Sequence, residues 1–209
     1  MTMTSKRTVL VVGLVGGIAS GKSSVAEMLG EMGAQVLDAD RINHEVLRQP
    51  EVVEEVVEQW GPDVLDGQGQ VDRKKLADKV FEADDAVKKL ESIVHPDVCR
   101  RIERAVEVER SKESTSVVVI DAPLLVEAGL DGQCDRIVYV DAPEAVRVQR
   151  VLADRGWDRK ELCRRESHQK SLSYKRNHAD IVITNGHSTG ELRKQVERLW
   201  DELSRLLSQ

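Results

Sequence analysis

One short segment near the start of the chain constrains the fold more than any other feature: Gly16-Gly17-Ile18-Ala19-Ser20-Gly21-Lys22-Ser23. It fits the pattern G-x-x-x-x-G-K-[ST] and stands between an apolar run, Val9–Val15, and a segment of helical spacing, Ser23–Met32. A strand, a glycine-rich turn and a helix in that order form the context in which this pattern binds phosphate. The sequence therefore predicts a phosphate-binding loop, or P-loop, at residues 16–23.

Each residue type in this loop has a physical role. Glycines let the backbone curl so that successive N–H groups point inward at an anion, and the start of a helix adds partial positive charge. The Lys22 ammonium can reach the β- and γ-phosphates, and the Ser23 hydroxyl suits Mg²⁺. We therefore expect Mg·ATP as the ligand and phosphoryl donor. Its expected contacts are Gly17, Ile18, Ala19, Ser20, Gly21, Lys22, Ser23 and Ser24.

Short Val- and Ile-rich runs alternate with segments of helical pattern along the rest of the chain. Such runs are typical of parallel strands covered on both faces. The predicted strands are Val9–Val15, Gln35–Asp38, Val117–Asp121, Arg136–Val140 and Asp180–Thr184. The predicted helices include Glu51–Trp60, Pro96–Arg110, Glu144–Arg155 and Glu191–Leu207. This alternation predicts an α/β fold, a doubly wound parallel five-stranded sheet of the P-loop NTPase type.

Two long gaps between strands predict lobes inserted into this core. The core is expected at 8–38, 117–145 and 180–209, with a helical insert at 39–116 and a lid at 146–179. Residues 146–176 carry ten basic and four acidic side chains. A cationic lid over ATP would neutralise the γ-phosphoryl group and exclude water, a competing nucleophile. A solvated helix pair explains most of these charges equally well, but Arg150 is a candidate for function.

Carboxylates stand at the ends of two predicted strands. Asp38 and Asp40 follow the second strand, and Asp121 ends the third in the manner of a Walker B element. Since carboxyl ends of parallel strands line the ligand crevice, one of them can accept the proton of an attacking hydroxyl. We favour Asp40 as this base and Asp38 as part of the Mg²⁺ shell. A plain helix N-cap for Asp40, and a plain turn residue for Asp121, are the alternatives.

Composition limits the other classes of function. The net charge is −6, which points to neither nucleic acid nor an anionic membrane as partner. The apolar runs are too short for a membrane span, and Met1–Arg7 has no apolar core of a signal peptide and is expected to be a frayed terminus. The cysteines, Cys99, Cys134 and Cys163, are odd in number and lack a CxxC pair, so we expect buried, inert thiols in a cytoplasmic protein.

Taken together, these motifs resemble the dephospho-coenzyme A kinase family over almost the whole chain. The matching stretches are GLVGGIASGKSSVA (13–26), DADRINHEVL (38–47), LESIVHP (90–96), DAPLLVEAGL (121–130), RVQRVLADRG (147–156), Gln169 and ADIVITNG (179–186). The resemblance implies ATP-dependent phosphorylation of the ribose 3′-hydroxyl of dephospho-coenzyme A, the last step of coenzyme A synthesis. It also implies that 39–116 binds this small-molecule substrate and that 146–179 is the lid.

The resemblance further assigns roles to single residues. Lys22, Asp40 and Arg150 look like the catalytic set, and Asn185 like a residue on the adenine side. On the substrate side it places Asp38, His95, Asp121, Pro123, Leu124 and Leu125, and for the metal we expect Ser23, Asp38 and Asp121. A monomer or a small homo-oligomer is expected.

Two positions depart from the family pattern. Ala19 stands where the family usually has glycine, which such a loop tolerates if its φ angle is negative. Val126 stands where an aromatic residue is common, and with 3% aromatic residues the adenine must be stacked by arginine or aliphatic groups. Another P-loop kinase of the nucleoside or nucleotide type, or a nucleotide-dependent switch without transfer, are the alternatives. No guanine-reading NKxD motif follows the last strand, where Asn185-Gly186-His187-Ser188 stands instead.

Overall fold

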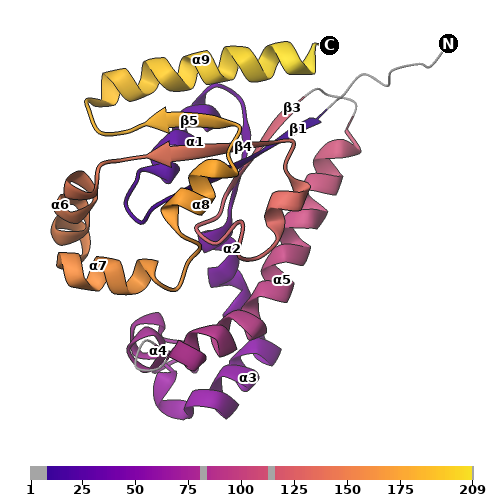
Figure 1. The fold of residues 1–209 in the computed structure, drawn as a ribbon. Helices are drawn as coiled ribbons and strands as arrows, with labels where there is room; N and C mark the ends of the chain where they lie inside the picture. The colour runs from indigo at the N-terminus through magenta and orange to yellow at the C-terminus, as the bar shows by residue number, and fades with distance from the viewer. Residues whose placement is uncertain (1–8, 81–83, 113–115, 209) are drawn as a thin grey trace. The chain divides into compact units, whose positions relative to one another are not determined.

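The computed structural model describes residues 9–80, 84–112 and 116–208. Met1–Arg7, the segment expected to be a frayed terminus, lies outside these residues. At the centre is a five-stranded parallel sheet in the order β2-β3-β1-β4-β5 (Figure 1). The strands are β1 (Val9–Gly16), β2 (Gln35–Asp38), β3 (Ser116–Asp121), β4 (Arg136–Asp141) and β5 (Ile181–Thr184). The predicted α/β fold class is confirmed, and each predicted strand is present.

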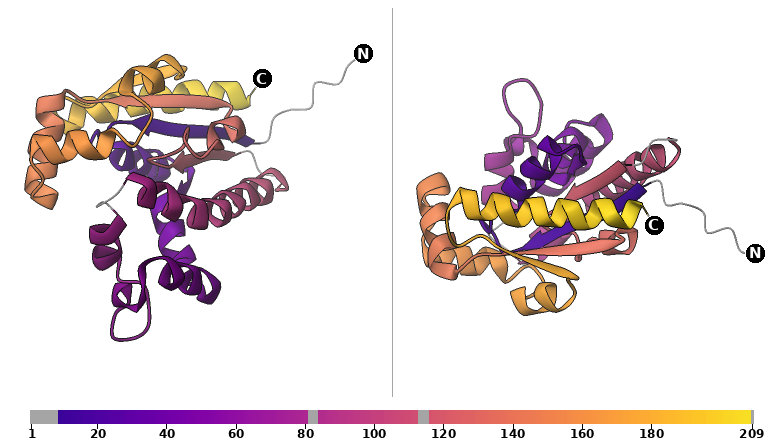
Figure 2. Two further views of the ribbon diagram at one scale, coloured as in Figure 1. Left: turned by 60° about the horizontal axis from the view of Figure 1, so that its bottom comes forward. Right: turned by 90° about the horizontal axis from the view of Figure 1, so that it is seen from above.

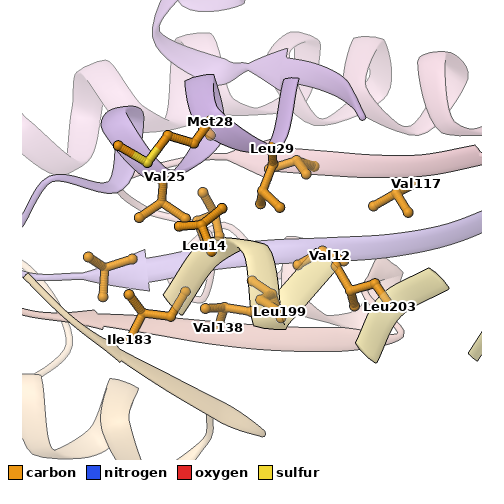
Figure 3. Close-up of a cluster of buried hydrophobic side chains, with 14 of the residues drawn as sticks. Val12, Leu14, Val25, Met28, Leu29, Val117, Val138, Ile183, Leu199 and Leu203 are labelled. Carbon is orange, nitrogen blue, oxygen red and sulfur yellow. The ribbon is translucent and has the colours of Figure 1, made fainter. Parts of the chain in front are cut away.

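One face of the sheet is covered by the helices α1 (Lys22–Glu31) and α9 (Thr189–Leu207). Figure 2 shows α9 running alongside the strands. Side chains alternate across a strand, so every second residue of β1 faces this layer. Figure 3 shows the resulting cluster, which includes Val12, Leu14, Val25, Met28, Leu29, Val117, Val138, Ile183, Leu199 and Leu203. This packing holds α1, and with it the loop before α1, against the carboxyl end of β1.

The remaining helices follow the strands or form the insert. They are α2 (Ala39–Val46), α3 (Pro50–Trp60), α4 (Arg73–Val80), α5 (Asp84–Arg110), α6 (Glu144–Arg155), α7 (Arg159–Glu166) and α8 (Leu172–Asn177), with short 3₁₀ turns η1 (Pro62–Val64) and η2 (Leu130–Gln133). None of the helices in the described part of the chain is long and apolar enough to cross a membrane.

The chain forms two compact units. One contains the sheet and comprises the residues up to Asp38 and those from Glu103 onward; the other is Ala39–Ile102. The second unit has its own apolar core, in which Val46, Val56, Val64 and Ile102 are fully buried. It covers most of the expected insert 39–116, whose role in binding substrate stays a prediction.

The sequence predicts a helix that begins at Pro96, and this prediction is wrong. Pro96 lies inside α5, which starts at Asp84. A proline within a helix removes one backbone hydrogen bond and costs about 3 kcal/mol. The helix continues because Val94 and Val98, on either side of Pro96, and Ile102 one turn further are all buried. His95 is therefore a half-buried residue in the middle of a helix.

The expectation of three buried thiols is wrong for Cys163, which is exposed on α7, and Cys99 and Cys134 are only partly buried. Cys134 is largely enclosed, and its Sγ lies 2.7 Å from where a Cβ on Gly13 would stand. Burial, together with the nearby Asp131 and Asp135, raises the pKa of Cys134 to about 12. This thiol is therefore inert, as expected, since the thiolate is the reactive form.

The α1 layer gives a direct test of the core. Leu29→Ala removes a side chain that is fully buried among strand and α9 residues and should lower the free energy of unfolding by about 2–5 kcal/mol in urea denaturation. Leu152→Ala on α6 is the control, since Leu152 is 57% exposed. A loss at Leu29 no larger than at Leu152 would contradict this account of the core.

Candidate nucleotide-binding and phosphoryl-transfer site

The predicted P-loop connects β1 to α1, as the motif requires. Gly21 has φ 93°, in the left-handed region that favours glycine. A Cβ on Gly16 would lie 2.5 Å from the carbonyl oxygen of Val140 and 2.8 Å from Ser20 Oγ. The loop therefore curls tightly enough for its N–H groups to form an anion site only because these two positions lack a side chain.

Lys22, the first residue of α1, is only 9% exposed. Its Nζ donates to the carbonyl oxygens of Gly16 at 3.4 Å and Gly17 at 3.2 Å. The ammonium thus lies folded over the loop, where these carbonyls compensate part of its burial. A phosphate held by the loop N–H groups would meet this charge directly.

Ala19 does not meet the condition under which alanine is tolerated, because its φ is 58°. It is the one non-glycine residue with positive φ among the described residues. An L-residue in the left-handed region is strained by roughly 1–2 kcal/mol, since its Cβ approaches the following carbonyl. The loop stores this strain at a binding site, as functional loops often do.

Arg150 and Asn185 hold the loop from the outside. Arg150, on α6, donates to the carbonyl oxygens of Ala19 at 3.0 Å and Ser20 at 3.2 Å, and to the carbonyl and Oδ1 of Asn185 at 3.2 Å each. The Asn185 side chain is buried and donates to the Ser20 carbonyl at 2.8 Å. Asn185 was predicted to contact ATP and Arg150 to be catalytic, and the structure places both against the loop.

A cavity of about 520 Å³ adjoins this cluster. Its lining includes Ala19, Gly21, Arg150, Val151, Asn185 and Leu192. The volume suits a nucleoside, since small-molecule pockets commonly measure about 300–1,000 Å³. The described lining residues include no Phe, Tyr or Trp, so a base here would contact arginine and aliphatic groups, Met28 or the imidazole ring of His187.

Two of the predicted metal-site carboxylates lie side by side. Asp38 and Asp121 are register partners at the carboxyl ends of β2 and β3. Ser23 is exposed in the first turn of α1. The described residues hold no cluster of three or more His, Cys, Asp or Glu side chains able to bind a metal alone. One or two carboxylates with a hydroxyl nevertheless fit Mg²⁺, which usually keeps waters and takes further oxygens from phosphate.

The other predicted site residues belong to α2, α5 and the turns after β3. Asp40 is exposed in the first turn of α2, which begins at Ala39, so it is not the N-cap residue considered as its alternative role. Asp40 and His95 both belong to the second unit. Pro123 and Leu124 are half-buried in the turns after β3, and Leu125 is fully buried, with a methyl group 2.9 Å from where a Cβ on Gly13 would stand.

Four charged residues near these loops were missed as individuals. Lys175 is 1% exposed on its side chain and forms an ion pair with Glu127 at 3.0 Å; it also donates to the Pro123 carbonyl at 3.2 Å. Arg147 pairs with Glu166, and both contact the P-loop. The only signal in the sequence is the basic composition of 146–176. This composition does not distinguish the residues of these buried pairs from the solvated charges around them, and Glu127 lies outside the segment.

The parallel sheet with a P-loop between its first strand and first helix defines the class of P-loop nucleotide-binding proteins. The sequence model of the family described as Dephospho-CoA kinase matches residues 10–191. The chain is 41% identical to the Dephospho-CoA kinase of Thermobifida fusca over 95% of this chain and 98% of that protein. It therefore belongs to the dephospho-CoA kinase family.

Solved structures show the same fold. A crystal structure of TT1252 from Thermus thermophilus has a TM-score of 0.73 and 34% identity, covering 93% of this chain and 97% of that one. A Dephospho-CoA kinase from Campylobacter jejuni has a TM-score of 0.70 at 23% identity, covering 94% and 98%, and shows the same fold. The resemblance read from the motifs is thus confirmed.

The strain at Ala19 predicts that glycine at this position stabilises the protein, whereas glycine within a helix destabilises it. Ala19→Gly should raise the free energy of unfolding by up to about 1 kcal/mol, because glycine adopts a positive φ without a steric penalty. Ala153→Gly, at an exposed position within α6, should lower it by about 0.5–1 kcal/mol. Urea denaturation of both variants measures the two effects, and the same sign for both would contradict strain at position 19.

Proposed function

We propose that Lys22, Asp40 and Arg150 carry the transfer of the γ-phosphoryl group of ATP to the ribose 3′-hydroxyl of dephospho-coenzyme A. Family membership makes the chain a kinase of coenzyme A synthesis. The observation that carries the residue assignment is the loop itself, since the cationic groups of Lys22 and Arg150 both donate to its carbonyl oxygens.

The nucleotide binds with its phosphates in the loop and its base in the adjoining cavity. The loop N–H groups hold the β- and γ-phosphates, and Lys22 and Arg150 neutralise the charge that develops on the transferred group. Asn185 fixes the loop at Ser20 and lines the cavity, so it orients the nucleoside end. This arrangement needs little motion of the loop, because the glycines already hold it curled.

The acceptor side depends on carboxylates after β2 and β3. Asp40 accepts the proton of the 3′-hydroxyl as its oxygen attacks phosphorus, and ADP leaves. Ser23, Asp38 and Asp121 would hold Mg²⁺, directly or through water, and the ion neutralises phosphate charge when bound. The insert 39–116 with His95, and the loop with Pro123, Leu124 and Leu125, bind the coenzyme A moiety.

Residues 146–179 act as the lid that keeps water from the γ-phosphoryl group. The protein works in the cytoplasm as a monomer or small homo-oligomer, with small molecules rather than nucleic acid or membrane as partners. The exposed thiol of Cys163 suits a reducing compartment.

The reaction is tested by ADP release with a panel of acceptors. Dephospho-coenzyme A should stimulate ADP release by about a hundredfold or more over water alone, the scale of a positioned proton acceptor. Coenzyme A is the matched control, since its 3′-position is already phosphorylated and it should give no stimulation. Stimulation by another alcohol but not by dephospho-coenzyme A would overturn the proposal.

The proton acceptor is tested by two isosteric variants. Asp40→Asn should lower kcat by about 10²–10⁴-fold, because an amide cannot accept the proton, while ATP affinity in calorimetry changes little. Asp38→Asn should raise the Mg²⁺ concentration needed for half-maximal rate, because a ligand is lost, and it should lower kcat less than Asp40→Asn does. The reverse pattern, with the larger loss of kcat at Asp38, would exchange the two roles.

A further inference from the structure

A carboxylate of the proposed lid occupies the phosphate loop. Glu166, the last residue of α7, accepts the backbone N–H of Ile18 through Oε1 at 3.0 Å. The two residues are 148 positions apart in the chain. Backbone N–H groups of this loop form the site that binds phosphate anions, so Glu166 places a negative charge where the ligand's charge is expected.

Arg147 completes this contact. Its Nη1 forms an ion pair with Glu166 Oε1 and donates to the carbonyl oxygen of Ile18 at 3.5 Å. The side chains of Arg147 and Glu166 are 5% and 18% exposed. Arg147 Nε is buried without a hydrogen-bond partner among the described residues, so the guanidinium keeps unused donor capacity beside the loop.

The loop is shaped to receive this pair. A Cβ on Gly17 would lie 2.8 Å from Arg147 Nη1 and 2.9 Å from Glu166 Oε1, so any other residue at position 17 would push the pair away. Glu166 lies at the C-terminal end of α7, where the helix dipole is itself negative, while the basic residues of the last turn, Arg164 and Arg165, form ion pairs with Glu161. The charge of Glu166 is therefore stabilised by its contacts outside α7, with Arg147 and the N–H of Ile18.

We propose that Glu166 is an internal competitor for the triphosphate, and that it sets the affinity of the enzyme for ATP. In the nucleotide-free protein, Glu166 occupies the Ile18 N–H and binds α7 to the loop. When ATP enters, its phosphate displaces the carboxylate, and Arg147 exchanges Glu166 for a phosphate oxygen. This inference rests on the ATP site of the proposed function but not on the identity of the acceptor alcohol.

The energetic consequence follows from linkage. In the open form, Glu166 has left the N–H of Ile18. If ATP binds only this form, its apparent dissociation constant equals the intrinsic one divided by the fraction of molecules that are open. A carboxylate that closes the site nine times in ten would therefore weaken ATP binding about tenfold. Removing the charge of Glu166 should restore this tenfold loss of ATP affinity, whereas a change of charge elsewhere on α7 should leave the affinity unchanged.

The test is calorimetric titration of the full chain with ATP, and separately with tripolyphosphate, in the absence of acceptor. Glu166→Gln should tighten both ligands about tenfold, because the competition concerns the phosphates and not the nucleoside. Glu166→Asp, which keeps the charge but shortens the side chain by one methylene, should also tighten them. Glu161→Gln is the matched control: Glu161 lies on the same helix but pairs with Arg164 and Arg165, and its loss should leave both affinities unchanged.

Equal or weaker binding by Glu166→Gln would overturn the inference. Equal tightening by Glu161→Gln would also overturn it, because the effect would then be one of net charge. If wild-type protein binds neither ligand, the proposed nucleotide site fails together with this inference. If both ligands bind wild type and only the variant effect is missing, the inference alone fails.

Discussion

The complete burial of β1 is the constraint on which the rest of the structure depends. All eight residues of this strand are buried, and it pairs with β3 on one side and β4 on the other. A buried strand must satisfy its backbone groups by pairing, and the burial of its side chains fixes the register with both neighbours. That register places Gly16 beside Val140 and Leu14 beside Asp121, so the start of the loop and the end of β3 meet at one edge of the sheet. The pairing of the strands therefore determines where the phosphate site lies, and the side chains of the loop do not.

Much of this could be predicted because the signals are local. The Val- and Ile-rich runs gave every strand, and the glycine and lysine spacing gave the loop, since both patterns reflect backbone requirements within a few residues. Arg150 and Asn185 were found as well, but by resemblance and lid composition rather than from their contacts. The hydrogen bonds that join them to residues 19 and 20 span at least 130 positions and leave no local trace.

What could not be predicted depends on such long-range contacts. Pro96 reads as the start of a helix, but α5 continues through it because apolar residues on both sides of it are buried. Ala19 reads as an ordinary substitution, but its φ is set by the turn that the loop must make between two fixed elements. In the sequence, Glu166 is one acidic residue in a basic segment. Only the folded structure shows that it accepts a hydrogen bond from the backbone N–H of Ile18. In each case tertiary structure outweighed the local preference.

The burial of Lys22 and Lys175 has a chemical consequence of another kind. Thioesters acylate amines, and acylation removes the positive charge of a lysine. Coenzyme A, the product of this family, forms thioesters of this kind. Lys22 is 9% exposed and the side chain of Lys175 is 1% exposed, whereas Lys160 and Lys170 are open to solvent. Adventitious acylation would therefore fall first on the outer lysines, and the amine that meets the phosphates would stay unmodified the longest.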